Sequence, residues 1–228
     1  MPDRYALTDI GDLSTRFVLP AGVPAGVKRS YNTSPIQTVP VIIIKDGVRV
    51  MERMKWGFIP TGAKDTNSVF RYKTHHARSE DVFSKPIWQN AIRTKRCLIP
   101  ANGFYAWRKT PKGKYAFYIR PTDQALFAFA GIYGEWTDPE GHSHGICAII
   151  TTASDSMSDQ IPSRLPVIVH PDDEATWLDP TVSSVSTLIK IMRPLEPDQL
   201  TIVRVSDAIN SSKPNAPSLI TPLERTAE

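Results

Sequence analysis

The chain has 228 residues, of which 41% are hydrophobic and 22% are charged, and its formal net charge is +4. This length is enough to bury a hydrophobic core, and the composition excludes a disordered or fibrous protein. The mildly basic charge suits a polyanionic partner, but many proteins with this charge bind none, so it selects neither class. Basic residues cluster at 28–29, 93–96 and 108–114. Each cluster predicts either a positive face or an ordinary solvated one.

Turn signals and apolar runs predict a chain rich in strands. Residues 39–44 are apolar and mostly β-branched, Lys45-Asp46-Gly47 is a turn signal, and residues 48–55 follow, which together predict a hairpin. Further strands are expected at 104–107, 115–120, 125–132, 145–152, 165–170 and 200–205. Cys97 and Cys147 lie in apolar runs typical of strands, so buried free thiols are expected there.

Helical segments are fewer and are expected at 9–17, 79–95, 171–178 and 183–192. Pro86 should break the second segment or start its later part. Pro171 suits a first helical turn, and the acidic residues after it oppose the positive helix end. The order of these expected strands and helices predicts the α+β class. We expect a single domain over 1–228, built on a mostly antiparallel, curved or barrel-like sheet with peripheral helices.

The sequence shows no apolar run long enough to cross a bilayer. Its first residues also lack the basic and then apolar pattern of a secretory signal. We therefore expect a cytoplasmic protein without a membrane partner.

Five segments carry a resemblance to a known family. They are MPDRYALT at the start, YNTSPIQTVPVI at 31–42, MKWGFIPTGAKD at 54–65, HARSE through RCLIPANGFYAW at 76–107, and IITTASDSMSDQIPSRLPVIVHP at 149–171. In this order they resemble the SOS response-associated peptidase (SRAP) family over nearly the whole chain. The resemblance implies a compact α+β domain of the DNA-damage response that binds single-stranded DNA and reacts with abasic sites.

The resemblance also implies a chemistry. In the family the initiator methionine is removed, and the amine and thiol of the exposed cysteine capture the sugar aldehyde as a thiazolidine, with an asparagine, a glutamate and a histidine lining the site. This chain departs at all four positions, which are occupied by Pro2, His76, Ala106 and Pro162. No thiazolidine can form without the thiol, so we expect an impaired enzyme or a pseudoenzyme.

Other positions keep the family pattern. Arg4, Arg78 and Arg164 stand where the family places arginines near the DNA backbone, and Trp107 stands where it has an aromatic beside the base stack. Guanidinium groups pair with phosphates, and an aromatic face stacks on any base. We therefore expect salt-sensitive binding to single-stranded or gapped DNA with little sequence preference. The ordinary alternatives are structural ion pairs for Arg78 and Arg164 and a core position for Trp107.

The sequence predicts no cofactor and no metal site. His75 and His76 are adjacent, and adjacent side chains on a strand point to opposite faces, which would make them poor joint ligands. His142 and His144 fall in a turn and form no ligand signature.

Two further functions stay open. If Met1 is removed, the secondary amine of Pro2 can attack an aldehyde, as in an abasic-site lyase, with His76 as the base. While Met1 is present, that nitrogen is an amide and is not nucleophilic. The other alternative is an interaction protein that keeps the fold and has lost DNA binding.

Overall fold

The structure, a computed structural model, describes residues 3–60, 63, 65–110, 113–154 and 162–223. Its strands are β1 (Tyr5–Leu7), β2 (Ser30–Thr33), β3 (Thr38–Lys45), β4 (Val48–Trp56), β5 (His76–Arg78), β6 (Arg96–Ala101), β7 (Gly103–Thr110), β8 (Gly113–Pro121), β9 (Phe127–Thr137), β10 (Ser143–Ala153), β11 (Arg164–Pro166), β12 (Ile168–Val169) and β13 (Leu200–Val205). Its α-helices are α1 (Leu13–Arg16), α2 (Ser68–Tyr72), α3 (Pro86–Gln89), α4 (Ala91–Thr94), α5 (Glu174–Leu178) and α6 (Val185–Ile191). Short 3₁₀ turns occupy Pro171–Asp173, Pro197–Gln199, Asp207–Asn210 and Pro217–Leu219.

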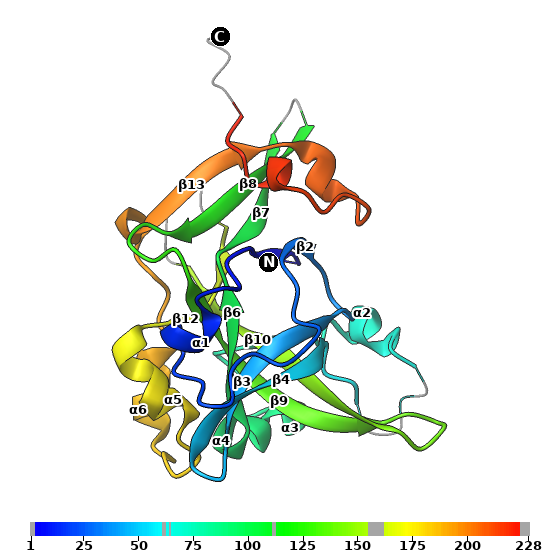
Figure 1. Cartoon of the computed structure of the whole chain (residues 1–228), viewed down its shortest axis with the longest axis vertical. Helices are drawn as coiled ribbons and strands as arrows, with labels where there is room; N and C mark the ends of the chain where they lie inside the picture. The colour runs from blue at the N-terminus through cyan, green and yellow to red at the C-terminus, as the bar shows by residue number, and fades with distance from the viewer. Residues whose placement is uncertain (1–2, 61–62, 64, 111–112, 155–161, 224–228) are drawn as a thin grey trace.

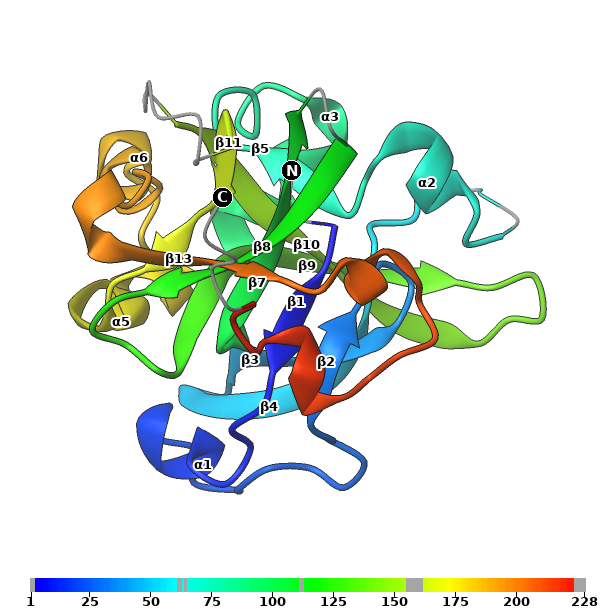
Figure 2. The same cartoon turned by 90° about the horizontal axis from the view of Figure 1, so that it is seen from above.

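The strands form two sheets (Figure 1). The larger one has the order β11-β10-β4-β3-β6-β9-β12, with β5 beside β10. Because β9 also pairs with β10, the strands β10, β4, β3, β6 and β9 close into a ring. The smaller sheet has the order β13-β8-β7-β1-β2, which can be followed in Figure 2. Most pairs are antiparallel, and the expected α+β, barrel-like class is confirmed.

The hairpin predicted at 39–55 forms as β3 and β4, with Lys45 paired to Val48. Asp46 and Gly47 have φ angles of 51° and 80°, the left-handed conformation that a tight two-residue hairpin turn requires. Both faces of β3 are buried, because the adjacent residues Val41 and Ile42 point to opposite faces and are both fully buried. Local turn chemistry and the apolar pattern therefore agree at this hairpin.

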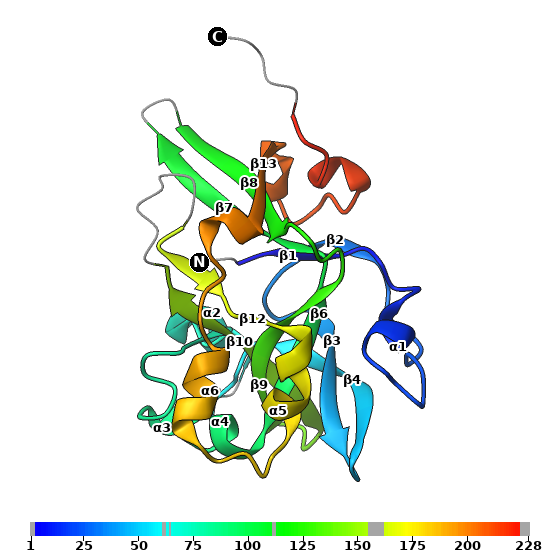
Figure 3. The same cartoon turned by 90° about the vertical axis from the view of Figure 1, so that its left-hand side faces the viewer.

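A single buried amide joins the two sheets. β6 belongs to the barrel and β7 to the smaller sheet, and only Asn102 separates them. The Asn102 Oδ1 accepts hydrogen bonds from the backbone N–H groups of Thr8 (2.7 Å) and Asp9 (3.0 Å), and its Nδ2 donates to the carbonyl of Ala125. Figure 3 shows the smaller sheet stacked on the barrel at this joint. The residues just after β1 are thereby tied to the joint between the two sheets.

The helices are shorter than the sequence predicts. The segment expected at 9–17 is helical only over α1, and the segment expected at 79–95 is two short helices. Residues 79–85 form turns because Ser79 bonds to β10 through Thr151 and Pro86 then starts α3 at its first turn. The helices expected at 171–178 and 183–192 are present, the first with a 3₁₀ turn at its start.

Arg96 is buried and does not contribute to a positive face. Its side chain is 2% exposed, and it donates hydrogen bonds to backbone carbonyls alone. The acceptors are Ile92, Arg93, Trp177, Asp179 and Val182. Burial lowers the pKa of Arg96, and the nearby charge of Asp179 opposes that shift. The basic cluster at 93–96 is therefore partly structural, because its last member fastens α4 and α5 to the start of β6.

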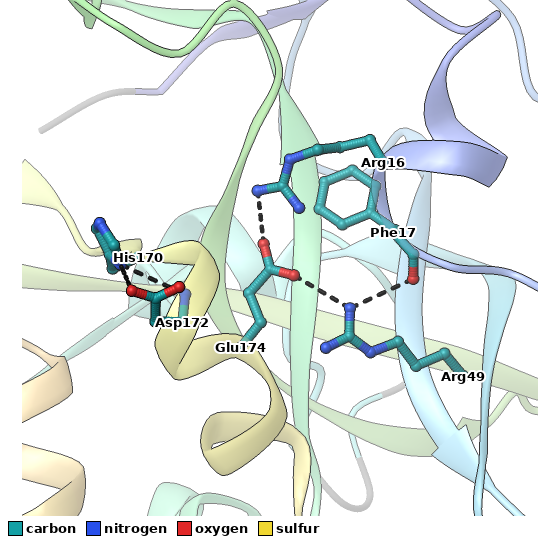
Figure 4. Close-up of polar contacts among 6 residues, drawn as sticks. All are labelled: Arg16, Phe17, Arg49, His170, Asp172 and Glu174. Atoms are coloured by element: carbon teal, nitrogen blue, oxygen red, sulfur yellow. Dashed lines mark hydrogen bonds and ion pairs between the residues drawn. The ribbon is translucent and has the colours of Figure 1, made fainter.

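A buried carboxylate connects three parts of the chain (Figure 4). Glu174 is 2% exposed and lies 2.7 Å from Arg16 and 3.1 Å from Arg49. Arg49 also donates a hydrogen bond to the carbonyl of Phe17, just after α1. These bonds fix α1 and α5 to β4.

Both cysteines are free and buried, as expected. Burial raises the pKa of the Cys97 and Cys147 thiols well above their ordinary value, so neither is a ready nucleophile. No helix in the described ranges has the length and apolar character needed to span a membrane.

Candidate nucleic-acid interface

Strand β1 places the start of the chain in a cavity. Tyr5 pairs with Thr33 of β2 and with Phe104 of β7, so the two residues before it reach the space beside α2. We call this space the N-terminal cavity, and its volume is about 650 Å³. Its lining residues are Asp3, Arg4, Ser34, Pro35, Phe70, Lys73, His75 and Ser212.

Arg4 is oriented by a buried amide. Its Nη1 donates to the Oδ1 of Asn32 at 2.5 Å, and the Asn32 Nδ2 donates in turn to the carbonyls of Ser211 and Pro214. Burial lowers the pKa of Arg4 while the charge of Asp3 raises it, and a guanidinium stays protonated at neutral pH. The structure thus supplies a fixed positive charge in the N-terminal cavity.

Two imidazoles meet one carboxylate at the base of this cavity. The Nε2 of His75 lies 3.1 Å from the Oδ1 of Asp3, and the Nδ1 of His76 lies 3.9 Å from the same oxygen. The two ring centroids are 4.4 Å apart, so the prediction that these side chains point to opposite faces is wrong. The reason is local, because β5 begins only at His76, and the carbonyl of His75 accepts a hydrogen bond from the Trp56 indole.

The charge state of Asp3 follows from this contact. Burial disfavours its ionised form, but the hydrogen bond from His75 and the positive charges around it outweigh burial. The pKa of Asp3 is therefore lowered from its ordinary value.

A second cavity of about 310 Å³ adjoins β5, and we call it the β5 cavity. Its lining residues are Tyr72, Lys73, His76, Arg78, Asp81, Lys85 and Trp88. Lys73 lines both cavities, and Arg78, which is exposed, lines this one. The predicted contact residues Arg4 and Arg78 therefore lie in neighbouring hollows with a shared lysine between them.

Helix α2 adds two aromatic side chains that the sequence analysis missed. Phe70 is 53% exposed in the N-terminal cavity, and Tyr72 is 61% exposed in the β5 cavity. The signal is present in the sequence as Phe70-Arg71-Tyr72-Lys73, where aromatic and basic residues alternate. Such interleaving is typical of surfaces on which nucleic-acid bases stack.

Arg164 is held by an ion pair. Its Nη2 lies 2.8 Å from the Oε2 of Glu80 and 2.9 Å from the carbonyl of Thr151, and only 17% of its side chain is exposed. Burial raises the pKa of Glu80, but the hydrogen bond from Arg164, the backbone hydrogen bonds of Glu80 and Ala153 and the charge of Arg164 together outweigh this, and the net shift is downward. The structure thus contains the structural pair that the sequence left as an alternative, and a DNA contact through Arg164 stays a prediction.

Trp107 lies away from both cavities. It is half-buried on β7, its indole donates to the Oδ1 of Asn210 at 2.7 Å, and the Nζ of Lys114 lies 4.9 Å from its ring centroid. A base could stack on this ring only where Lys114 and its neighbours leave it open. Trp56 is buried in the core and contributes no surface.

Comparison with known proteins identifies the family. The family model described as SOS response associated peptidase (SRAP) matches residues 1–212. The chain belongs to the SRAP family. Among curated SRAP relatives, the abasic site processing protein YoqW of Bacillus subtilis is 35% identical over 223 residues, covering 96% of this chain and 99% of the relative. The abasic site processing protein HMCES of Xenopus tropicalis is 29% identical, covering 82% of this chain and 64% of the relative.

Solved structures share the SRAP fold. A protein from Bacteroides thetaiotaomicron superposes with a TM-score of 0.85 at 24% identity, covering 97% of this chain and 99% of its own. A phage-related protein from Bordetella bronchiseptica gives a TM-score of 0.68 at 25% identity, covering 89% and 93% of the two chains.

The four positions at which the sequence predicts substituted family residues can be placed in part. His76 is buried and lines the β5 cavity, and Ala106 is buried on β7 at 5% exposure. Pro162 is half-buried before β11, and Pro2 lies outside the described residues. Of the three described positions, His76 is the one that lies beside Asp3 and His75.

Proposed function

We propose that this SRAP protein binds abasic sites in single-stranded or gapped DNA and does not form the thiazolidine expected of the family. The observation that carries the proposal is the pair of adjoining cavities with Arg4, Lys73 and Arg78 along them. Three cations that line adjoining cavities suit the phosphates of one DNA strand. The names of the relatives, which are abasic site processing proteins, support abasic DNA as the ligand.

The exposed aromatics of α2 support a strand with accessible bases. Phe70 and Tyr72 lie on α2 just before Lys73, so bases can stack on the rings while the backbone follows the charges. Bases of an intact duplex are already stacked on each other and are closed to such contacts. An abasic site or a gap lowers the cost of unstacking the neighbouring bases.

The substitutions support binding without the family's covalent chemistry. A thiazolidine needs a thiol next to the amine, and the second residue is Pro2. The position of the family glutamate is Ala106, which has no ionisable group to move a proton.

The test measures fluorescence anisotropy of labelled single-stranded, gapped and duplex oligonucleotides, each with and without one abasic site, over a range of salt concentrations. We expect tightest binding to abasic single-stranded or gapped DNA, weakened by salt. Lys73→Ala should reduce the slope of log K against log salt by about one, because one phosphate contact is lost. Lys190→Ala on α6, an exposed lysine outside both cavities, is the matched control and should leave the slope unchanged.

Denaturing gels of the protein incubated with the same oligonucleotides show whether a covalent adduct forms. No adduct is expected without borohydride. An adduct that appears only with borohydride, from protein whose Pro2 is shown by mass spectrometry to be N-terminal, would establish the lyase instead. Absence of DNA binding at low salt would leave the interaction protein as the better interpretation.

A further inference from the structure

Asp3, His75 and His76 form a cluster of potential metal ligands. One donor atom from each lies within 4.8 Å of the other two, and no other set of three among the described histidines, cysteines and acids does so. The Asp3 Oδ1 lies 3.1 Å from the His75 Nε2 and 3.9 Å from the His76 Nδ1. Two nitrogen ligands of a tetrahedral zinc ion are about 3.3 Å apart, which lies between these two distances. Small side-chain movements would therefore bring all three to coordination distance.

We propose that Asp3, His75 and His76 bind a divalent transition-metal ion of the zinc class. Two imidazole nitrogens and one carboxylate oxygen are ligands that zinc and its neighbours accept, whereas calcium and magnesium prefer oxygen alone. Three protein ligands leave one position of a four-coordinate ion for water or an oxygen anion. Asp3 and His75 line the N-terminal cavity, which also contains Arg4 and Lys73, so that position is accessible to an anionic ligand.

A satisfied core histidine is the ordinary alternative, and His75 does not fit it. Its ring is 5% exposed, and its Nδ1 is buried without a hydrogen-bond partner among the described atoms. A buried polar atom without a partner costs about 1–3 kcal/mol. The protein therefore holds two imidazoles 4.4 Å apart beside one carboxylate and leaves the Nδ1 of His75 without a partner, an arrangement that a bound cation would stabilise.

The chain offers an internal control with the same residue types. Asp138, His142 and His144 lie on the β9–β10 hairpin, where His144 Nε2 is 2.8 Å and His142 Nδ1 is 3.4 Å from the same Asp138 oxygen. His142 is 74% exposed, and this set does not bring its three donor atoms within the 4.8 Å spacing. A metal that merely selects aspartate and histidine would bind here as well.

This inference goes beyond DNA binding and does not depend on it, because the test uses metal ions alone. Protein without an affinity tag is stripped with a chelator and titrated with Co²⁺, following the visible d–d absorption, and with Zn²⁺ by calorimetry. We expect one equivalent of either ion to bind, with the intense Co²⁺ absorption of a four-coordinate site. Zn²⁺ should displace Co²⁺.

Variants separate the two clusters. Asp3→Asn removes a ligand charge from a residue that is 59% exposed, so the fold should persist, and it should weaken Zn²⁺ binding at least tenfold. His76→Ala should do the same, with thermal unfolding in chelator as a check on its fold. The double variant His142→Ala, His144→Ala should bind normally. No stoichiometric binding to the wild-type protein, or loss of binding in the hairpin variant instead of Asp3→Asn, overturns the proposal.

Discussion

Arg96 illustrates how one side chain can supply hydrogen bonds to several backbone carbonyls. Its guanidinium is buried and gives its hydrogen bonds to five carbonyls at the ends of α4 and α5 and in the turn that follows. From the sequence it was one of a group of basic residues, and nothing in that pattern distinguishes a buried arginine from an exposed one. Its role depends on which carbonyls the fold brings around it.

Replacing Arg96 should therefore be costly. Arg96→Lys keeps the charge but cannot reach five acceptors, and each buried carbonyl left unpaired costs about 1–3 kcal/mol. We expect the free energy of unfolding to fall by roughly 3 kcal/mol or more, as measured by urea denaturation. Arg93→Lys, at an exposed neighbour on α4, should change it by less than about 0.5 kcal/mol. Equal effects of the two variants would contradict the structural role.

At the start of the chain, a single substitution tests whether the N-terminal cavity still accepts the family's substrate. Pro2→Cys restores an amine and a thiol on one residue once Met1 is removed. We expect an adduct with abasic single-stranded DNA that forms without borohydride and is seen on denaturing gels. Pro2→Ser, with an amine but no thiol, should give an adduct only with borohydride. Failure of Pro2→Cys, when mass spectrometry shows the new cysteine to be N-terminal, would mean that the sugar does not reach it.

Helix α2 is the element whose function the sequence analysis did not foresee. It has only five residues, and its last neighbour, Lys73, adopts a left-handed conformation with φ 53° that ends it. So short a helix has little intrinsic stability, and only its Val69 packs into an apolar cluster while its aromatic residues stay exposed. An exposed pair of aromatic rings beside a cavity is more typical of binding than of packing.

Substitutions on α2 should affect binding and leave folding intact. Tyr72→Ala should weaken the affinity for single-stranded DNA by about 1–3 kcal/mol, because one base loses its stacking partner. Fluorescence anisotropy measures the change, and thermal unfolding checks the fold. Ile189→Ala on α6 removes an apolar side chain of similar exposure, 51%, and should have no effect on affinity. If Tyr72→Ala binds DNA as the wild type does, the stacking role is wrong.

Elements whose own residues specify a turn could be predicted from the sequence. Elements that form only because a strand distant in sequence pairs with them could not. The hairpin of β3 and β4 follows from its apolar, β-branched run and from the turn at Asp46-Gly47. Strands β1 and β5 have three residues each and exist because β7 and β10 pair with them. The pairing of β5 also explains why the rings of His75 and His76 lie together. The strand begins only at His76, so the two side chains do not alternate as they would inside a strand. The motif positions predicted Arg4 and Arg78 as DNA contacts, and both line a cavity, whereas the ion pair left open for Arg164 could not be assigned to Glu80.

Across the whole molecule, a few buried polar contacts connect parts of the chain that are distant in sequence. Glu174 joins α5 to Arg16 of α1 and Arg49 of β4, which are 158 and 125 residues away. The contact lies on the side of the barrel where these elements meet (Figure 4). The expectation of one domain over the whole chain stays a prediction, and this contact offers a way to examine it.

Glu174→Ala should lower the free energy of unfolding by about 3 kcal/mol, since two poorly solvated arginines lose their counter-charge. Urea denaturation followed by both tryptophan fluorescence and circular dichroism measures it, and coincident transitions would indicate that the joined parts unfold together. Glu52→Ala breaks the exposed pair with Lys45 and should cost less than about 1 kcal/mol. Similar losses in both variants would show that burial of Glu174 contributes little.

The position of β1 decides how the protein should be handled in the laboratory. Asp3 lines the N-terminal cavity, and any residue added before Met1 is joined to Asp3 through only two residues, a reach of about 10 Å at most. A purification tag placed there would begin at the entrance of the proposed DNA site, and a polyhistidine tag would bring competing imidazoles to His75 and His76. Leu223, by contrast, donates a backbone hydrogen bond to the carbonyl of Arg204 on β13 of the smaller sheet. Tags and fluorescent labels are therefore best attached at the carboxyl end, where they leave both measurements undisturbed.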